Sequence, residues 1–303
     1  MSHSEDNNSS TYKWVGSRPI RPDGVDKVTG RASFAADFSL PDMLHGLVLR
    51  STYAHARILN MDFSKALAIP GVKAIVCAKD MPVIAAENAL TGGQPPDFRD
   101  MSENLMARDK VLYEGHAIAA VAATSKRIAR QALDAIEIEY EVLPHVTDVQ
   151  VAMEPNAPLL SDKRYTQGID PRPKKPSNIA SRYEQILGDP AQGFAEAEVT
   201  VSEEFTTQPV HQGYIELHAC TAQIAADGQA QIWCSSQGQF MVRAYCAKLL
   251  AMDISQIRVI PMEIGGGFGG KTTVYLEPIA LLLARKSGRP VKMQMSRHEV
   301  FTS

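Results

Sequence analysis

The stretch Gly265–Thr272, with the sequence GGGFGGKT, lies between an apolar run and a helical pattern, and five of its eight residues are glycine. Glycine is the usual residue where the backbone takes a positive φ angle or comes close to a ligand. The stretch also matches G-x-x-x-x-G-K-[ST], the pattern of the phosphate-binding P-loop. It therefore predicts a binding loop, and nucleotide binding is the first hypothesis.

The composition of the chain is that of a globular protein without a nucleic-acid surface. Its 303 residues are 45% hydrophobic and 21% charged, with a formal net charge of −3. This length is enough for two domains of ~150 residues, and the charge offers no basic patch to nucleic acid or to a membrane. The longest uncharged apolar runs, such as 279–284, are far shorter than the ~18 residues of a membrane span.

The start of the chain and its cysteines predict a cytoplasmic protein. The opening MSHSEDNNSS is polar and acidic, unlike a signal peptide. The four cysteines, at positions 77, 220, 234 and 246, lack the close spacing that structural zinc or iron–sulfur clusters need. We therefore expect reduced thiols and no iron–sulfur cluster on this chain.

The first half of the chain predicts a disordered N-terminus over residues 1–15 and an α/β domain over residues 16–150. Residues 116–123 are a fully apolar strand, Ser125 follows as a helix cap, and residues 136–142 alternate as a half-buried strand. The other predicted elements are strands at 46–51, 56–63 and 72–78, a one-turn helix from Ser64, a loop over 79–107 and a helix over 126–136.

A proline-rich stretch then predicts an extended linker over residues 151–180, because six prolines lie between positions 151 and 193. Residues 181–303 predict a second, incomplete domain. Its predicted elements are helices at 190–197, 239–251 and 275–286, strands at 199–205, 257–264 and 291–295, and a hairpin over 220–235 that turns at Asp227-Gly228. No helix is predicted for the ending SRHEVFTS.

The P-loop hypothesis has the right local context, since a strand precedes the glycines and a helix follows them. Only 31 residues follow Thr272, however, and none of them forms an apolar strand that ends in an aspartate for magnesium. A purely structural turn is another interpretation, but five glycines then carry a large entropic cost without a use.

Several segments, in order along nearly the whole chain, resemble the molybdenum-binding large subunit of the xanthine dehydrogenase/aldehyde oxidase family. They are VGSRPIRPDGVDKVTGRASFAADF (15–38), LRSTYAHARI (49–58), LAIPGVKAIV (67–76), YEGHAIAAVAA (113–123), IEIEYEVLP (136–144), and WCSSQGQF (233–240) with GGGFGGK (265–271). The resemblance implies an α+β fold, in which an α/β hammerhead domain (16–150) is followed by part of the mixed α/β molybdopterin-binding domain (181–303).

The resemblance also implies an activity, cofactors and partners. Such an enzyme hydroxylates an electron-poor carbon of an aldehyde, an N-heterocycle or another aromatic compound, with oxygen from water. Its molybdenum is bound by molybdopterin, of which the cytosine dinucleotide form is one option, and carries oxo, sulfido and hydroxo ligands. Electrons leave through iron–sulfur clusters and FAD, which we expect on an iron–sulfur subunit and an FAD subunit.

No catalytic residue is expected on this chain. The family's general base is a glutamate far toward the C-terminus of a longer subunit, beyond Ser303. The sequence is therefore expected to be a truncated piece, or one half of a large subunit split into two polypeptides. Activity would then need the missing part or a partner chain, and a non-catalytic assembly subunit is the alternative.

By resemblance, Gln237 lies beside the metal, with Gly238 next to it, and its amide hydrogen-bonds the oxo ligand or the substrate. The same comparison places Gly267, Phe268 and Gly269 against the molybdenum centre, Phe268 and Gly269 through their backbones. Gln237 and Phe268 are thus the residues predicted to be nearest to the metal.

Thr272 departs from the family pattern. Purine-oxidising members carry an acidic residue directly after GGGFGGK, and here that position is Thr272. The departure argues against xanthine as substrate, and we expect Thr272 to face the substrate.

The segment HQGYIELH (211–218) offers a weaker hypothesis, a metal site made by His211, Glu216 and His218. A buried, hydrogen-bonded pair near the site is the preferred interpretation, and Glu216, which resembles a family motif glutamate, is not expected to be catalytic. His55 and His116 are expected to be structural. Lys271 is assigned no chemistry.

Overall fold

The computed structural model describes residues 12–84, 97–171 and 173–303, which fall into two units, Met1–Ser33 and Phe34–Ser303. The first unit contains one short helix, α1 (Gly24–Thr29), which ends at Gly30 with a φ angle of 75°. The disordered N-terminus predicted over residues 1–15 lies mostly outside the described residues. All other elements belong to the second unit.

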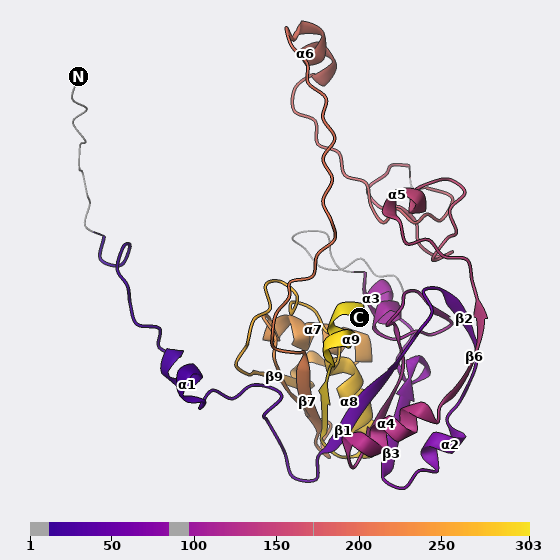
Figure 1. Cartoon of the computed structure of the whole chain (residues 1–303), viewed down its shortest axis with the longest axis vertical. Helices are drawn as coiled ribbons and strands as arrows, with labels where there is room; N and C mark the ends of the chain where they lie inside the picture. Colours follow the sequence, from indigo (N-terminus) through magenta and orange to yellow (C-terminus); the bar gives the residue numbers. More distant parts are fainter. Residues whose placement is uncertain (1–11, 85–96, 172) are drawn as a thin grey trace. The chain divides into compact units, whose positions relative to one another are not determined.

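Two sheets form the framework of the second unit (Figure 1). The larger has the strand order β3-β5-β1-β10-β7-β8-β9 and the smaller the order β4-β2-β6. The strands are β1 (Leu44–Arg50), β2 (Ala56–Asp62), β3 (Val72–Cys77), β4 (Lys110–Val111), β5 (Ala117–Ala123), β6 (Glu137–Val142), β7 (Ala219–Ile224), β8 (Ala230–Cys234), β9 (Ile257–Pro261) and β10 (Val291–Gln294).

Strands from both predicted domains share the larger sheet. β1 pairs in parallel with β10, and Gly46 lies opposite Met293. A Cβ atom at Gly46 would lie 2.6 Å from Cγ of Met293, so a larger residue here would displace the Met293 side chain. The domain boundaries proposed near residues 150 and 181 remain predictions, but the strands on either side of them form one sheet.

Strand β5 is apolar throughout because both faces of its sheet are covered. Ala120 and Ala122 pack into the core that contains helix α8 (Glu277–Ser287), whereas Val121 and Ala123 pack into a second core with helix α4 (Lys126–Asp134). The remaining helical elements are α2 (Ser64–Leu67), η1 (Ala78–Asp80), α3 (Phe98–Leu105), α5 (Val149–Ala152), α6 (Pro190–Glu196), α7 (Gln239–Leu250), η2 (Ile254–Gln256) and α9 (Arg297–Thr302).

Several predicted elements are confirmed. The hydroxyl of Ser125 caps α4 by accepting the backbone N–H of Ile128 at 3.2 Å. Strands β7 and β8 form the predicted hairpin, which turns at Gly228 with a φ angle of 86°. The half-buried strand over residues 136–142 is β6, which pairs with β2.

Three predictions were wrong. Helix α3 lies within the predicted loop 79–107, where Asp97 caps it by accepting the N–H groups of Arg99 and Asp100; residues 85–96 of that loop are outside the described part. Helix α9 forms at the ending predicted to lack a helix, with a capping box between Ser296 and Glu299. The strand predicted over 199–205 has no strand partner among the described residues.

The proline-rich segment 151–180 is held by hydrogen bonds within itself and to β4. The side chain of Asn178 donates to the carbonyls of Ala152 and Pro158 and accepts from the N–H of Leu160 at 3.0 Å. Lys110 in β4 donates to the carbonyl of Leu160. In the part of the chain that the structure describes, no helix is long and apolar enough to span a membrane.

His116 is expected to make folding depend on pH. Its ring is fully buried, Nδ1 accepts the N–H of Leu112, and Nε2 donates to the carbonyl of Glu103 at 2.8 Å. Burial lowers the pKa of His116 from 6.5 to about 4. Below pH 6.5 the ring in the unfolded chain binds a proton, whereas the buried ring in the folded chain stays neutral. The contribution of the neutral ring to the free energy of unfolding is therefore complete above pH 6.5. It is lost as the pH falls toward 4, by up to about 3 kcal/mol.

Urea unfolding between pH 7 and pH 4 measures this loss, and an NMR titration follows the His116 ring. The pH dependence should shrink in His116→Gln, because an amide takes up no proton. A His116 resonance that titrates near pH 6.5 would contradict the expectation.

Candidate functional site

The glycine run lies in a loop between the end of β9 at Pro261 and the start of α8 at Glu277. Its backbone turns back on itself through positive φ angles at Gly266 (98°), Phe268 (49°) and Gly269 (95°). Positive φ is uncommon for a residue with a side chain, and such strain is concentrated at functional sites. Phe268 is 74% exposed, so core packing does not explain why the conformation is held.

Gln237 lies against this loop, although some thirty residues separate them in sequence. Its side-chain Oε1 accepts the N–H of Gly269 at 3.0 Å and that of Lys271 at 3.1 Å. Its own N–H donates to the carbonyl of Lys271 at 2.9 Å. Two backbone donors on Oε1 fix the orientation of the amide. The Gln237 NH₂ group, which has no partner among the described residues, is left as a donor.

The glycines are needed because other residues approach the loop closely. A Cβ atom at Gly267 would lie 2.5 Å from Oε1 of Gln237, and one at Gly270 would lie 2.6 Å from Cε1 of Tyr214. A Cβ atom at Gly265 would lie 2.8 Å from Cβ of Glu216. The loop is therefore shaped on one side by Gln237 and on the other by the HQGYIELH segment.

A buried ion pair joins that segment to the loop. Lys271 is only 1% exposed, and its Nζ lies 2.6 Å from Oε2 of Glu216. The same Oε2 accepts the N–H of Gly265 at 2.7 Å, while Oε1 of Glu216 is buried without a hydrogen-bond partner in the described structure. Burial lowers the pKa of Lys271, and the neighbouring Glu216 carboxylate opposes that effect. We read the pair as charged, because the short contact unites an ammonium with a carboxylate.

Tyr214 and His218 complete the support. The hydroxyl of Tyr214 lies 2.7 Å from Nε2 of His218, and the Lys271 ammonium lies 5.0 Å from the centroid of the Tyr214 ring. Burial lowers the pKa of His218 to about 4 and raises that of Tyr214. His218 is therefore neutral at pH 7. Arg297 of α9 donates to the carbonyl of Tyr214 at 2.8 Å and so anchors the segment from the far end of the chain.

The proposed metal site of His211, Glu216 and His218 does not form. Nδ1 of His211 accepts the N–H of Gly213, Glu216 binds Lys271, and His218 binds Tyr214. Over the described ranges, no group of three or more His, Cys, Asp or Glu side chains could hold a metal ion. Glu216 and His218 are hydrogen-bonded, as preferred from the sequence, but with other partners and not with each other.

The geometry also opposes the P-loop hypothesis. In a P-loop the lysine points toward the phosphates and the helix begins directly after it. Here Lys271 points into the protein toward Glu216, and α8 begins only at Glu277. The Thr272 hydroxyl donates to the carbonyl of Gly269 at 2.9 Å. The loop therefore lacks the arrangement that would hold a nucleotide.

Comparison with known proteins gives the family. The profile for the aldehyde oxidase and xanthine dehydrogenase a/b hammerhead domain matches residues 29–144, and that for the molybdopterin cofactor-binding domain matches residues 172–303. The chain belongs to the xanthine dehydrogenase/aldehyde oxidase family. The predicted fold class, an α/β hammerhead domain followed by a molybdopterin-binding domain, is confirmed.

Relatives in this family are similar along nearly the whole chain. A probable xanthine dehydrogenase subunit from Bacillus subtilis is 34% identical over 280 residues, 92% of this chain and 35% of that protein. The nicotinate dehydrogenase large molybdopterin subunit of Eubacterium barkeri is 33% identical over 291 residues, 96% of this chain and 63% of that protein. Quinoline 2-oxidoreductase from Pseudomonas putida 86 superposes with a TM-score of 0.78 at 31% identity, over 94% of this chain and 35% of that chain.

The chain thus spans about a third of the length of two of these relatives and less than two thirds of the third. In a molybdopterin-binding family, the residues at the glycine run fit such a group on geometric grounds. The N–H groups of Gly266, Gly267 and Phe268 make no hydrogen bond to the described residues. Together with the positive φ angles, they form the kind of backbone concavity that binds anionic groups. A Cβ atom at Gly269 would meet nothing within 4 Å, so space adjoins the loop there.

Some of the predicted site residues lie next to one another. Gln237, Gly267 and Gly269 are in contact, and Phe268 lies between the two glycines. Gly238 is the N-cap residue that precedes α7, and its N–H donates to Oγ of Ser236. Their roles toward the cofactor remain predictions. Sequence reasoning assigned no role to Tyr214 or Lys271, and spacing alone offered no signal for Lys271, because its partner lies 55 residues away.

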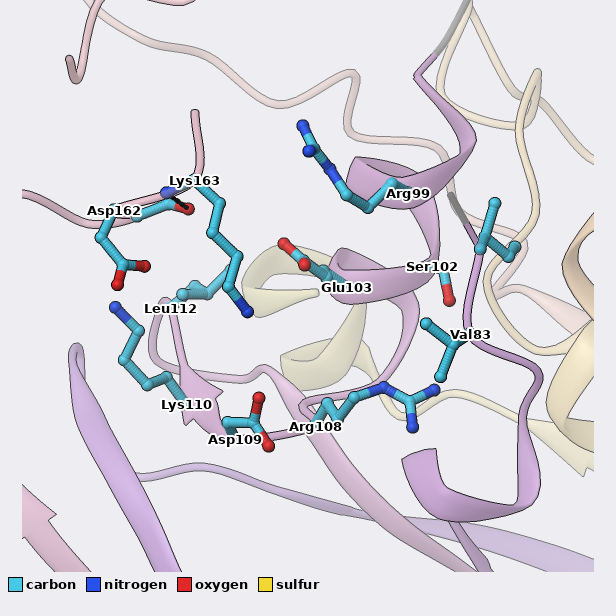
Figure 2. Close-up of a pocket in the computed structure, with 12 residues that line it drawn as sticks. Val83, Arg99, Ser102, Glu103, Arg108, Asp109, Lys110, Leu112, Asp162 and Lys163 are labelled. Carbon is cyan, nitrogen blue, oxygen red and sulfur yellow. Dashed lines mark hydrogen bonds between the residues drawn. The ribbon is translucent and has the colours of Figure 1, made fainter. Parts of the chain in front are cut away.

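A hollow that is lined by several charged side chains lies elsewhere in the fold (Figure 2). Charged side chains of both signs line it, among them Glu103, Arg108, Asp109, Lys110 and Lys163. Its described lining residues include neither Gln237 nor any residue of the glycine run or of the HQGYIELH segment. The hollow is thus separate from the candidate site, and its mixed charges do not select a cofactor.

Proposed function

We propose that this chain supplies one side of the molybdopterin site of a molybdenum hydroxylase, which hydroxylates an electron-poor carbon of an aldehyde, an N-heterocycle or another aromatic compound. The proposal rests on the fixed orientation of the Gln237 amide. Its oxygen is held by the N–H groups of Gly269 and Lys271, and its NH₂ group is free to donate. A fixed neutral donor beside an open backbone concavity suits a metal-bound oxygen.

When bound, the molybdenum–pterin group would supply the redox chemistry that inserts oxygen from water and accepts two electrons. The residues of this chain bind and orient it. The N–H groups of Gly267 and Phe268 would bind its anionic atoms, and Gln237 Nε2 would donate a hydrogen bond to it or to the substrate. The ion pair of Lys271 and Glu216 fixes the loop on the side that faces the protein interior.

The other components of the enzyme are part of the same proposal. The general base is a glutamate on the remainder of the large subunit, and electrons pass to iron–sulfur clusters and FAD on partner subunits. The pterin is of the plain or the cytosine dinucleotide form. A cytoplasmic location suits the free, buried Cys77, Cys220, Cys234 and Cys246.

The substitution Gln237→Glu tests the central role. A carboxylate still accepts the two backbone N–H groups but has no N–H to donate, so the loop should keep its shape while the donor is lost. We expect the assembled enzyme to retain molybdenum, measured by elemental analysis, and its kcat to fall at least about tenfold, the value of one hydrogen bond to a charged group. Unchanged kcat would reject the role of Gln237. Absence of molybdenum from the assembled wild-type complex, with activity that survives cyanide, would reject the function and favour an assembly subunit.

Thr272 is proposed to contact the substrate, and Thr272→Glu should change substrate preference. A carboxylate at this position can accept hydrogen bonds from an N-heterocycle. The ratio of kcat/KM for a purine to that for an aromatic aldehyde should therefore rise about tenfold. Thr272→Val is the control, because it loses the bond to the Gly269 carbonyl without adding a charge. If the ratio stays the same in Thr272→Glu, the residue does not face the substrate.

A further inference from the structure

The segment between α6 and HQGYIELH, residues 199–210, lies outside any helix or strand and follows α6 as a long open trace (Figure 1). No backbone hydrogen bond joins it to any other residue that the structure describes, and every residue in it is exposed. Unpaired, extended backbone is a template for the addition of another strand. The segment thus has free donors and acceptors along its length.

Its side chains alternate as those of a half-buried strand do. Val199, Val201 and Phe205 fall on one face and are 78%, 77% and 88% exposed. The opposite face is polar throughout and consists of Thr200, Ser202, Glu204, Thr206 and Gln208. Glu203 and Thr207 are the polar residues on the apolar face within 199–207. A period of two with one apolar face is the pattern of a strand that covers a core. That core is not provided by the described residues of this chain.

The segment leads directly into the candidate site. His211 follows it, and Tyr214 and Glu216 further on contact Gly270 and Gly265 of the glycine run. Val210 and Ile215, at the junction, are exposed, and so is Phe268 of the loop. A polypeptide that pairs with the segment is therefore brought toward the open side of the loop.

We propose that residues 199–207 form a β-strand on the edge of a sheet in the polypeptide that completes the large molybdenum-binding subunit, with Val199, Val201 and Phe205 packed on its apolar side chains. The inference rests on the proposed function for the identity of that partner. The relatives support this occupant, because this chain spans only 35% of the Bacillus subtilis protein. Pairing would then complete the molybdopterin site and cover its apolar border in one step.

Hydrogen exchange on the assembled enzyme tests the strand. Amides in residues 199–207 should exchange on the order of 100-fold more slowly in the complex than in this chain alone, because ladder hydrogen bonds protect them. Equal exchange in both samples would overturn the proposal. Protection that develops in the isolated chain as its concentration rises would show a second copy as the occupant, and would overturn it as well.

Two lysine substitutions at neighbouring positions test the face. Val201→Lys places a charge on the apolar face, and Ser202→Lys places the same charge on the polar face. Both sites are exposed in this chain alone, so neither substitution should change its melting temperature. Val201→Lys should weaken assembly at least about tenfold in dissociation constant, or about 1.4 kcal/mol, and Ser202→Lys should not. Equal effects of the two would overturn the proposed face.

The outcomes separate this inference from the proposed function. Protection of residues 199–207 in a complex that contains no molybdenum would keep the strand and reject the function. Molybdenum in a complex whose residues 199–207 exchange freely would reject the strand and keep the function.

Discussion

Glu216→Ala should lower the free energy of unfolding by about 3–5 kcal/mol, because it leaves the Lys271 ammonium buried without its counter-charge. Lys271 is almost completely buried, and Glu216 also accepts the N–H of Gly265, which would lose its partner. Such a loss corresponds to a decrease of roughly 10 °C in melting temperature for a unit of this size. Calorimetry or circular dichroism on the purified chain measures it.

Two further variants identify the cause. Lys271→Met combined with Glu216→Gln removes both charges, so the double variant should be more stable than Glu216→Ala alone. Lys286→Met is the control, because the ion pair of Lys286 with Asp80 is half-exposed and worth less than about 1 kcal/mol. A Glu216→Ala protein as stable as the Lys286→Met protein would show that Lys271 finds other compensation.

Under the proposed function, Gly267→Ala should reduce the activity of the assembled enzyme at least about 100-fold, since displacement of a positioning group by about 1 Å costs that much. The new Cβ atom would lie 2.5 Å from Oε1 and 2.7 Å from Cδ of Gln237, and these groups cannot occupy the same space. Either Gln237 or the loop must move, and in both cases the donor no longer faces the concavity. Steady-state kinetics of the purified complex, normalised to molybdenum content, give the result.

Gly193→Ala provides the comparison for that measurement. A Cβ atom at Gly193 in α6 would meet nothing within 4 Å, and its φ angle is not positive. The substitution should therefore leave activity unchanged. Wild-type activity in Gly267→Ala would mean that the close contact between the loop and Gln237 has no role in the reaction.

The sequence predicted those features that depend on neighbours along the chain. The apolar strand β5, the Ser125 cap and the Gly228 turn each carry a local signal, and each formed as expected. Helix α9 also carried one, since Ser296 and Glu299 have capping-box spacing. The sequence prediction missed this signal. The helix is six residues long, and its Thr302 lies against Gly115.

Features that depend on distant partners could not be predicted in this way. The glycine run indicated a binding loop, but nothing in it indicated that Lys271 would turn inward to Glu216. Residues 199–205 were predicted to be a strand, but a strand requires a partner, and the described chain supplies none. The relation of Gln237 to the loop was predicted from the resemblance to a protein family and not from a local sequence pattern. In the structure, Gln237 and the loop are in contact.

The parallel pairing of β1 with β10 has a consequence for biosynthesis. The paired residues lie roughly 250 positions apart, so a ribosome that adds ~5–20 residues per second needs about 10–50 s to deliver β10 after β1 has emerged. During that time β5 can pair with one edge of β1 while the other edge stays open to unwanted partners. Nascent chains of this protein should therefore depend on chaperones until β10 has been translated.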